Sequence, residues 1–176
     1  NNTGHVRVYE YSSGSWTKLG SNINGEAGGD MSGWSVSLSS DGTIVAVGAI
    51  KNDGGSAPSN NRGHVRVYEY KIPSQPEWNI TDHEANGYVL KGDDAENANP
   101  TSNTKYWVKL GGDIDGENEG DRSGPSVSLS SDGTIVAIGA PQNSNTYGHV
   151  RVYQYDSSKT TADALGPAGW NKLGLD

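Results

Sequence analysis

The segment DIDGENEGD, residues 113–121, contains the side chains best suited to bind a metal ion. Its candidate ligands are Asp113, Asp115, Glu117 and Asp121. Closely spaced carboxylates are ligands that calcium prefers, and a complete calcium site takes about six to eight oxygens. The segment therefore predicts calcium as a candidate cofactor, with part of the ligand set visible in the sequence.

An earlier segment has the same pattern with fewer acids. NINGEAGGD, residues 22–30, has asparagine at the first and third positions, where the later segment has aspartate. In a second interpretation both segments are turns, rich in glycine, in which Asp30 and Asp121 accept hydrogen bonds from backbone amides of GDMSG and GDRSG. The calcium site and the turn stand as alternatives.

Histidine and arginine recur within a repeated octapeptide. GHVRVYEY begins at Gly4 and Gly63, and GHVRVYQY begins at Gly148. The equivalent side chains are His5, His64 and His149, and Arg7, Arg66 and Arg151. Three symmetric copies on separate units cannot converge on one substrate. We therefore expect these side chains to be structural, with packed stems and hydrogen-bonded polar tips.

The chain shows no motif of a nucleophilic enzyme. It has no cysteine, and neither SGWSVS nor SGPSVS spells G-x-S-x-G. His83 is the only histidine outside the repeats, and it lies in a polar stretch. The sequence therefore favours a protein that is not an enzyme.

Four short blocks recur in a fixed order along the chain. Block one is WSVSLS or PSVSLS, and block two is TIVAVGA or TIVAIGA. Block three is the octapeptide, and block four is WTKLG, WVKLG or WNKLG, beginning at Trp16, Trp107 and Trp170. The order is three-four, one-two-three-four, one-two-three-four. Such repetition indicates a fold built from repeated structural units.

Each block has the pattern of a β-strand. SVSLS alternates apolar and polar residues, and TIVAVGA is apolar on both faces, as in a strand covered on both sides. Asp-Gly between blocks one and two, at residues 41–42 and 132–133, predicts a hairpin. Four antiparallel strands with small residues early and bulky ones late predict an all-β fold of β-propeller blades. A β-sandwich is the competing architecture.

The block order predicts about two and a half blades with ten principal strands. Residues 1–24 form the outer half of a first blade, residues 25–111 a second blade with an insertion at 71–105, and residues 112–176 a third blade. Together they form one propeller domain or part of it. We expect the chain to be a section of a longer repeat protein.

The run SGWSVSLSSDGTIVAVGA followed by GHVRVY resembles the FG-GAP repeat of integrin alpha-subunit propellers and of microbial surface proteins. The resemblance covers most of the chain outside residues 71–105. It implies a propeller whose first two strands flank a calcium loop, D-x-D-x-D-G. Here only the final Asp-Gly of that loop is present, and Ser-Gly at residues 32–33 and 123–124 replaces Phe-Gly. The resemblance therefore implies degenerate calcium loops.

Composition excludes several classes of partner. The net charge is −8 over 176 residues, and the clustered Lys and Arg that bind nucleic acid are absent. No apolar run approaches the roughly 18 residues that span a bilayer. Asn1 and Asn79 begin N-x-S/T tripeptides and are candidate glycosylation sites.

These observations predict a non-catalytic, extracellular or cell-surface module for adhesion or structural assembly. Its loops would bind a protein or glycan, and the insertion at residues 71–105 is either a partner-specific surface or a tolerated insertion. Two alternatives stay open. One is a subunit of a surface filament whose blade edges pair with further copies of the repeat, and the other is a propeller-fold carbohydrate-active enzyme.

Overall fold

The computed structural model describes residues 2–54, 60–72, 89–90, 105–143 and 147–174. These residues form twelve β-strands and no helix, which confirms the all-β class. Every pairing between the named strands is antiparallel. The strands form three sheets, none of which closes on itself.

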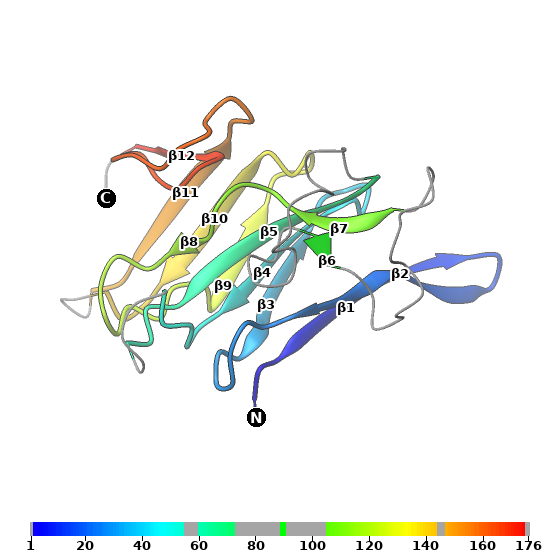
Figure 1. Cartoon of the computed structure of the whole chain (residues 1–176), viewed down its shortest axis with the longest axis horizontal. Coiled ribbons are helices and arrows are strands. Elements are labelled where there is room, and N and C mark those ends of the chain that lie inside the picture. Colours follow the sequence, from blue (N-terminus) through cyan, green and yellow to red (C-terminus); the bar gives the residue numbers. More distant parts are fainter. Residues whose placement is uncertain (1, 55–59, 73–88, 91–104, 144–146, 175–176) are drawn as a thin grey trace.

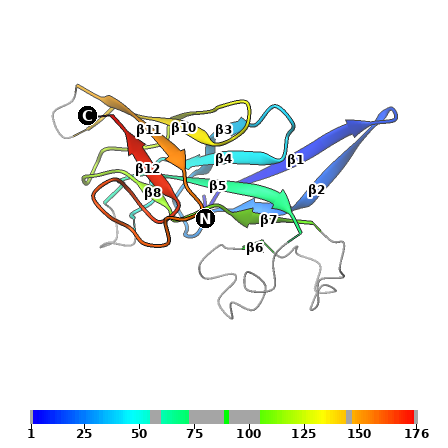
Figure 2. The same ribbon diagram turned by 90° about the horizontal axis from the view of Figure 1, so that it is seen from above.

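The first and third sheets contain strands in chain order. The first is the hairpin of β1 (His5–Ser12) and β2 (Ser15–Asn24), whose tip extends beyond the other strands (Figure 2). The third has the order β12-β11-β10-β9. Its strands are β9 (Ser126–Leu129), β10 (Ile135–Ala140), β11 (His149–Tyr155) and β12 (Trp170–Leu173).

The second sheet has the order β3-β4-β5-β7-β6. Its strands are β3 (Ser32–Leu38), β4 (Ile44–Ala49), β5 (His64–Lys71), β6 (Val89–Leu90) and β7 (Tyr106–Lys109). The short β8 (Ile114–Asp115) pairs with the start of β5. Ten of the twelve strands coincide with the sequence blocks. The ten predicted principal strands are all present, and the structure adds β6 and β8, which have only two residues each and no alternating pattern.

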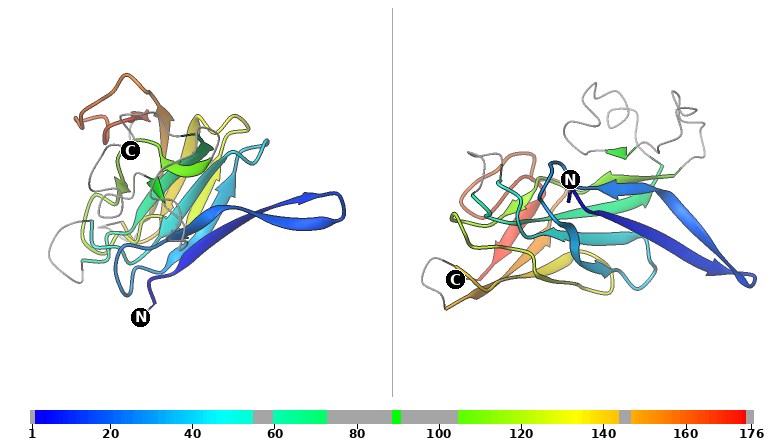
Figure 3. Two further views of the ribbon diagram at one scale, coloured as in Figure 1. Left: turned by 45° about the vertical axis from the view of Figure 1, so that its right-hand side comes forward. Right: turned by 90° about the horizontal axis from the view of Figure 1, so that it is seen from below.

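The sheets are stacked in chain order, with the second between the first and the third (Figures 1 and 3). Alternate side chains of β4 point to opposite sides of the sheet, as strand geometry requires. Val45 and Val47 pack toward the first sheet, and Ala46 packs toward the third. β4 is therefore covered on both faces, as the doubly apolar block two predicted.

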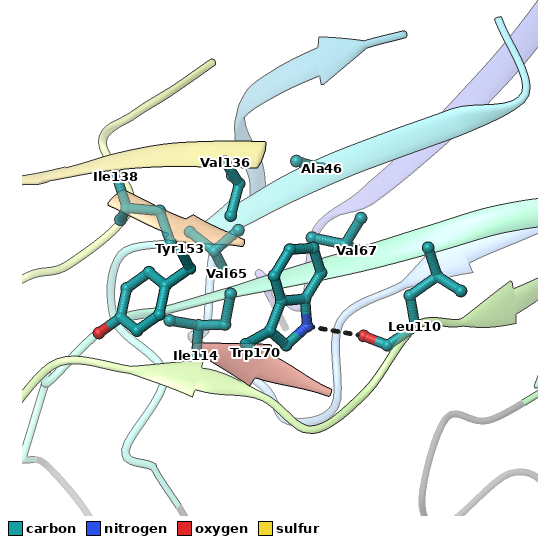
Figure 4. Close-up of a cluster of buried hydrophobic side chains, with 9 residues drawn as sticks. All are labelled: Ala46, Val65, Val67, Leu110, Ile114, Val136, Ile138, Tyr153 and Trp170. Carbon is teal, nitrogen blue, oxygen red and sulfur yellow. Dashed lines mark hydrogen bonds between the residues drawn. The ribbon is translucent and has the colours of Figure 1, made fainter. Parts of the chain in front are cut away.

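Two apolar cores fill the spaces between neighbouring sheets. Between the first and second sheets the buried residues are Val8, Ile23, Val45, Val47, Tyr68 and Trp107. Between the second and third sheets they are Ala46, Val65, Val67, Leu110, Ile114, Val136, Ile138, Tyr153 and Trp170 (Figure 4). The two cores use equivalent repeat positions, so each sheet docks on the next in the same way.

The tryptophan of block four fastens each sheet to the one before it. The Trp107 indole donates a hydrogen bond to the carbonyl of Leu19 (2.8 Å). The Trp170 indole donates to the carbonyl of Leu110 (2.9 Å), as Figure 4 shows. Both rings are fully buried, whereas the equivalent Trp16 is 68% exposed on the first sheet. We call this repeated bond the indole bond.

The first strands of the second and third sheets approach closely. The Ser35 hydroxyl donates to the carbonyl of Gly124 (2.6 Å), and the Ser37 hydroxyl accepts from the amide of Leu129 (2.9 Å). A side chain at Gly48 would overlap the Gly124 carbonyl. The small residues of blocks one and two are therefore needed where the sheets come closest.

The predicted Asp-Gly hairpins are confirmed. Asp41 accepts hydrogen bonds from the hydroxyl of Ser39 (2.7 Å) and from the amide and hydroxyl of Thr43. These donors lower the pKa of Asp41 to about 2. Gly42 follows with a φ of 72°, which favours glycine. Asp132 makes the same bonds in the third sheet, and its pKa is lowered for the same reasons.

Candidate functional site

The loops at one edge of the sheets contain most of the buried charge. The segment that enters the third sheet runs along the loop before β5, with backbone bonds from Gly116 to Gly63 (2.8 Å) and from Ser123 to Arg62 (2.7 Å). The side-chain amide of Asn52 bonds Glu26 and Asp30 in the corresponding segment before the second sheet. We call the residues at 25–31, 50–54, 60–63 and 112–123 the polar loop end.

Arg66, on β5, binds two carboxylates of the polar loop end. Its guanidinium donates two hydrogen bonds to Asp113, with Nε to Oδ1 at 3.0 Å and Nη2 to Oδ2 at 2.8 Å. The same Nη2 contacts Glu26, and Lys109 bonds Asp113 at 2.8 Å. Burial alone would raise the pKa of Asp113, but Arg66 and then Lys109 hold it well below its usual range. Asp113 is therefore ionised, and its carboxylate is bound by Arg66 and Lys109.

The other two repeat arginines bind residues at equivalent positions of the repeat. In the third sheet Arg151 is buried and forms an ion pair with Glu117, which occupies the position of Glu26 one unit later. In the first sheet Arg7 is exposed and donates to Asn22 (3.0 Å), the counterpart of Asp113. Arg66 and Arg151 thus pair with carboxylates of the neighbouring loops, and the structural role of the repeat arginines stays a prediction.

His64 is buried beside this ion-pair cluster. Its Nδ1 lies 3.9 Å from Asp115 and 4.0 Å from Asp113, and it has no hydrogen-bond partner among the described residues. Burial, followed by the charge of Arg66, lowers the pKa of His64 to about 4. His64 is therefore neutral at neutral pH, and its closeness to the carboxylates is not an ion pair there.

Asp115 has the opposite shift. Burial, together with the negative charges of Asp113 and Glu26, raises the pKa of Asp115 to about 6. The carboxyl thus titrates close to neutral pH. Asp115 also lines a cleft, and a change in its charge alters the electric field in that cleft.

The three repeat histidines do not share a site. His5 is exposed on β1, His64 is buried on β5, and His149 is half-buried on β11. They lie on three different sheets. Their differing burial follows from the place of each sheet in the stack.

Three of the four predicted calcium ligands, Asp113, Glu117 and Asp121, have separate partners. Asp113 is bound by Arg66, and Glu117 by Arg151. Asp121 is fully buried, and its Oδ2 accepts from the amide of Asn118 (2.8 Å). No three of the four bring ligand atoms within 4.8 Å of one another. This geometry favours the turn interpretation, and calcium binding stays a prediction.

The turn differs in detail from the one expected. Asp30 accepts from the amide of Ala27 (2.9 Å), and Asp121 accepts from that of Asn118. Both amides precede the aspartate by three residues, whereas the expected donors were within GDMSG and GDRSG. The chain reverses before the aspartate because Gly29 and Gly120 have positive φ.

A different trio brings metal-ligating atoms together. Glu26, His64 and Asp113 place one such atom each within 4.8 Å of the others. Arg66 lies among them and donates to both carboxylates. Its guanidinium supplies the positive charge that a metal ion would bring, so the trio does not fit a metal centre.

A cleft opens beside the polar loop end. Its volume is about 340 Å³. Its lining includes Asp113, Asp115, Glu117, Arg151, Tyr153, Asp163, Leu165, Pro167 and Lys172. The cleft is therefore lined by carboxylates, by the cations of Arg151 and Lys172, and by apolar groups such as Leu165. This mixture suits a ligand with both hydroxyl groups and apolar surface.

Sequence reasoning missed Glu26, Lys109 and Asp163. Glu26 and Glu117 occupy equivalent positions, as do Arg66 and Arg151, so the repeat alignment contained the signal for their pairing. Asp163 lies in a segment between β11 and β12 that has no counterpart in the other units. The candidate glycosylation sites Asn1 and Asn79, and His83, lie outside the described residues.

No protein-family model matches the chain, and a search of curated proteins finds no significant match. Across the described ranges, the structure contains no helix of the length and apolarity needed to cross a membrane.

Proposed function

We propose that the three sheets are blades of a β-propeller of the FG-GAP type with degenerate calcium loops. Two sheets run through four antiparallel strands in chain order, as propeller blades do. Small residues lie where the first strands of neighbouring sheets meet, and tryptophan fills the space at the fourth strand. These features support blades arranged around an axis near β3 and β9.

The proposed module is non-catalytic and acts outside the cell or at its surface, in adhesion or structural assembly. The observation that carries this proposal is that the buried arginines bind carboxylates of the chain itself. Arg66 and Arg151 tie each blade to the segment before it, so they support the framework. This framework holds the loops of the cleft in place, which is how propellers present binding surfaces.

A glycan is the ligand class that the cleft supports best. Carboxylates such as Glu117 and Asp163 accept hydrogen bonds from sugar hydroxyls, and Leu165 and Pro167 offer apolar surface to the sugar ring. A protein segment with basic and apolar side chains is the second ligand class.

The test is a glycan array probed with the labelled chain, followed by calorimetry on the strongest ligand. Leu165→Arg fills the cleft without touching the core, because Leu165 is exposed, and it should lower affinity at least about tenfold. Val36→Arg, on exposed β3 surface, is the matched control and should bind like the unmodified chain. Equal binding by all three proteins would place the ligand elsewhere, and no binding at all would oppose the glycan proposal.

A second candidate is a carbohydrate-active enzyme, and Asp115 is the observation that favours it. A carboxyl with a raised pKa in a cleft that also contains ionised carboxylates is one feature of glycoside hydrolases. Chromatography of the bound glycan after incubation distinguishes the two functions. Unchanged glycan supports the binding module, whereas release of sugar that Asp115→Asn abolishes would establish the enzyme.

A further inference from the structure

The two ends of the stack expose different faces. The outer face of the first sheet carries Tyr9, Tyr11 and Trp16, which we call the tyrosine face. The outer face of the third sheet carries Val150, Val152 and Leu173, which we call the valine face. Trp16 is 68% exposed, Val150 66% and Leu173 42%. Both faces are therefore apolar surfaces open to solvent.

Inside the chain, a valine face packs on a tyrosine face twice, once between each pair of neighbouring sheets. The valine faces of the first and second sheets consist of Val6, Val8 and Leu19, and of Val65, Val67 and Leu110. They pack on the tyrosine faces of the second and third sheets, which consist of Tyr68, Tyr70 and Trp107, and of Tyr153, Tyr155 and Trp170. Each internal contact joins a valine face to a tyrosine face in the same direction.

The burial of the octapeptide differs among the three sheets, according to which of its faces has a neighbouring sheet. On β5 both faces of the strand are buried, because the second sheet has a neighbour on each side. On β1 Val8 is buried while Tyr9 and Tyr11 are exposed. On β11 the pattern is reversed, with Tyr153 buried and Val150 exposed. One sequence therefore leaves opposite faces open at the two ends of the stack.

The tyrosine face of the first sheet already has the geometry of the buried ones. The ring centroids of Tyr11 and Trp16 lie 5.1 Å apart. The buried Tyr70–Trp107 and Tyr155–Trp170 pairs have separations of 5.1 and 5.2 Å. Docking a valine face here therefore needs little rearrangement of these rings.

We propose that the valine face of one copy of this chain docks on the tyrosine face of a second copy, so that copies associate head to tail. The contact repeats the internal one, and the Trp16 indole donates to the Leu173 carbonyl of the next copy. The surface is separate from the cleft, so this association is independent of the proposed ligand.

Such a contact is heterologous, because each copy uses a different patch of its surface. A second copy that docks leaves one tyrosine face and one valine face open at the ends of the pair. Association therefore continues beyond a dimer, either to a closed ring or to a linear chain of copies.

The test is sedimentation velocity on the chain and two variants, from about 1 µM to about 500 µM. Trp16→Glu places a charge on the tyrosine face, and Val150→Glu places one on the valine face. Both positions are exposed, so both variants should keep the fold, as circular dichroism will show. The unmodified chain should form species larger than a dimer, and each variant alone should stay monomeric. Val36→Glu, exposed to a similar degree on β3, should associate like the unmodified chain.

Mixing the two variants gives the decisive result. Each retains the face that the other has lost, so the mixture should form a dimer and stop there. The proposal is overturned by a chain that stays monomeric at the highest concentration, by a mixture no larger than its components, or by variants that associate as the unmodified chain does.

Discussion

The repeat arginine shows how position in the stack decides what a residue contributes. Arg66 is buried between Asp113 and Glu26, whereas Arg7 has the same flanking sequence and lies on exposed surface. Removing Arg66 leaves two carboxylates without their main cation, and breaking a buried pair in this way costs about 3 to 5 kcal/mol.

We therefore predict that Arg66→Leu lowers the free energy of unfolding by about 3 kcal/mol. Arg7→Leu is the matched control and should change it by less than about 1 kcal/mol, because Arg7 is exposed and its partner Asn22 is neutral. Urea unfolding followed by tryptophan fluorescence measures both. Equal losses in the two variants would show that burial does not distinguish the two arginines.

His64 and Asp115 predict a pH dependence in which two opposite contributions offset one another. The pKa of His64 is lowered from 6.5 to about 4 in the folded chain, so its contribution to stability is lost as pH falls from about 6.5 to about 4. The pKa of Asp115 is raised from 3.8 to about 6, so its contribution is lost as pH rises through about 6.

Asp115→Asn removes the second contribution. The stability of this variant should rise between about pH 4 and pH 6.5, by roughly 1 to 3 kcal/mol, because only the unfolded state then binds a proton at His64. His64→Gln should show the reverse slope. Urea unfolding at a series of pH values gives the profiles, and parallel profiles for the unmodified chain and both variants would refute the assignment.

Calcium separates the two interpretations of residues 113–121. The turn interpretation predicts a melting temperature that is unchanged by several millimolar calcium or by a chelator, because arginines already bind Asp113 and Glu117. Differential scanning fluorimetry measures the shift. A rise with calcium that disappears in both Asp115→Asn and Asp121→Asn would instead establish a calcium site.

At the scale of the strands, the repeat blocks predicted most of the fold. Ten strands and both Asp-Gly hairpins follow from alternation and turn chemistry, which act within a few residues. The partners of Arg66 and Arg151 did not follow, because each arginine pairs with a glutamate in the distant loop that leads into its own sheet. The position of the cleft also depends on the loop around Asp163, which no repeat describes.

The close approach of strands predicts a difference between two equivalent glycines. A methyl group at Gly48 would overlap the backbone carbonyl of Gly124 in the next sheet. At Gly139 the nearest obstacle is the Ser126 hydroxyl, a side chain that can rotate. Gly48→Ala should cost about 2 kcal/mol or more, and Gly139→Ala less than about 1 kcal/mol. Thermal unfolding measures both, and equal costs would contradict the proposed sheet contact.

At the scale of the whole molecule, three sheets dock one on another in the same direction. The second sheet has neighbours on both faces and holds both apolar cores together. The outer faces of the first and third sheets are open. The packing of a valine face on a tyrosine face therefore explains the interior of the chain and predicts that the two open faces associate between copies.

The most direct test of this docking is hydrogen exchange of the tryptophan indole groups, followed by NMR of the dilute chain. Trp→Phe variants assign the signals. We predict that the indole hydrogens of Trp107 and Trp170 exchange slowly, near the rate of global unfolding, because each is buried and bonded to the preceding sheet. The Trp16 hydrogen should exchange within the dead time. Similar exchange rates for all three would contradict the stacked arrangement.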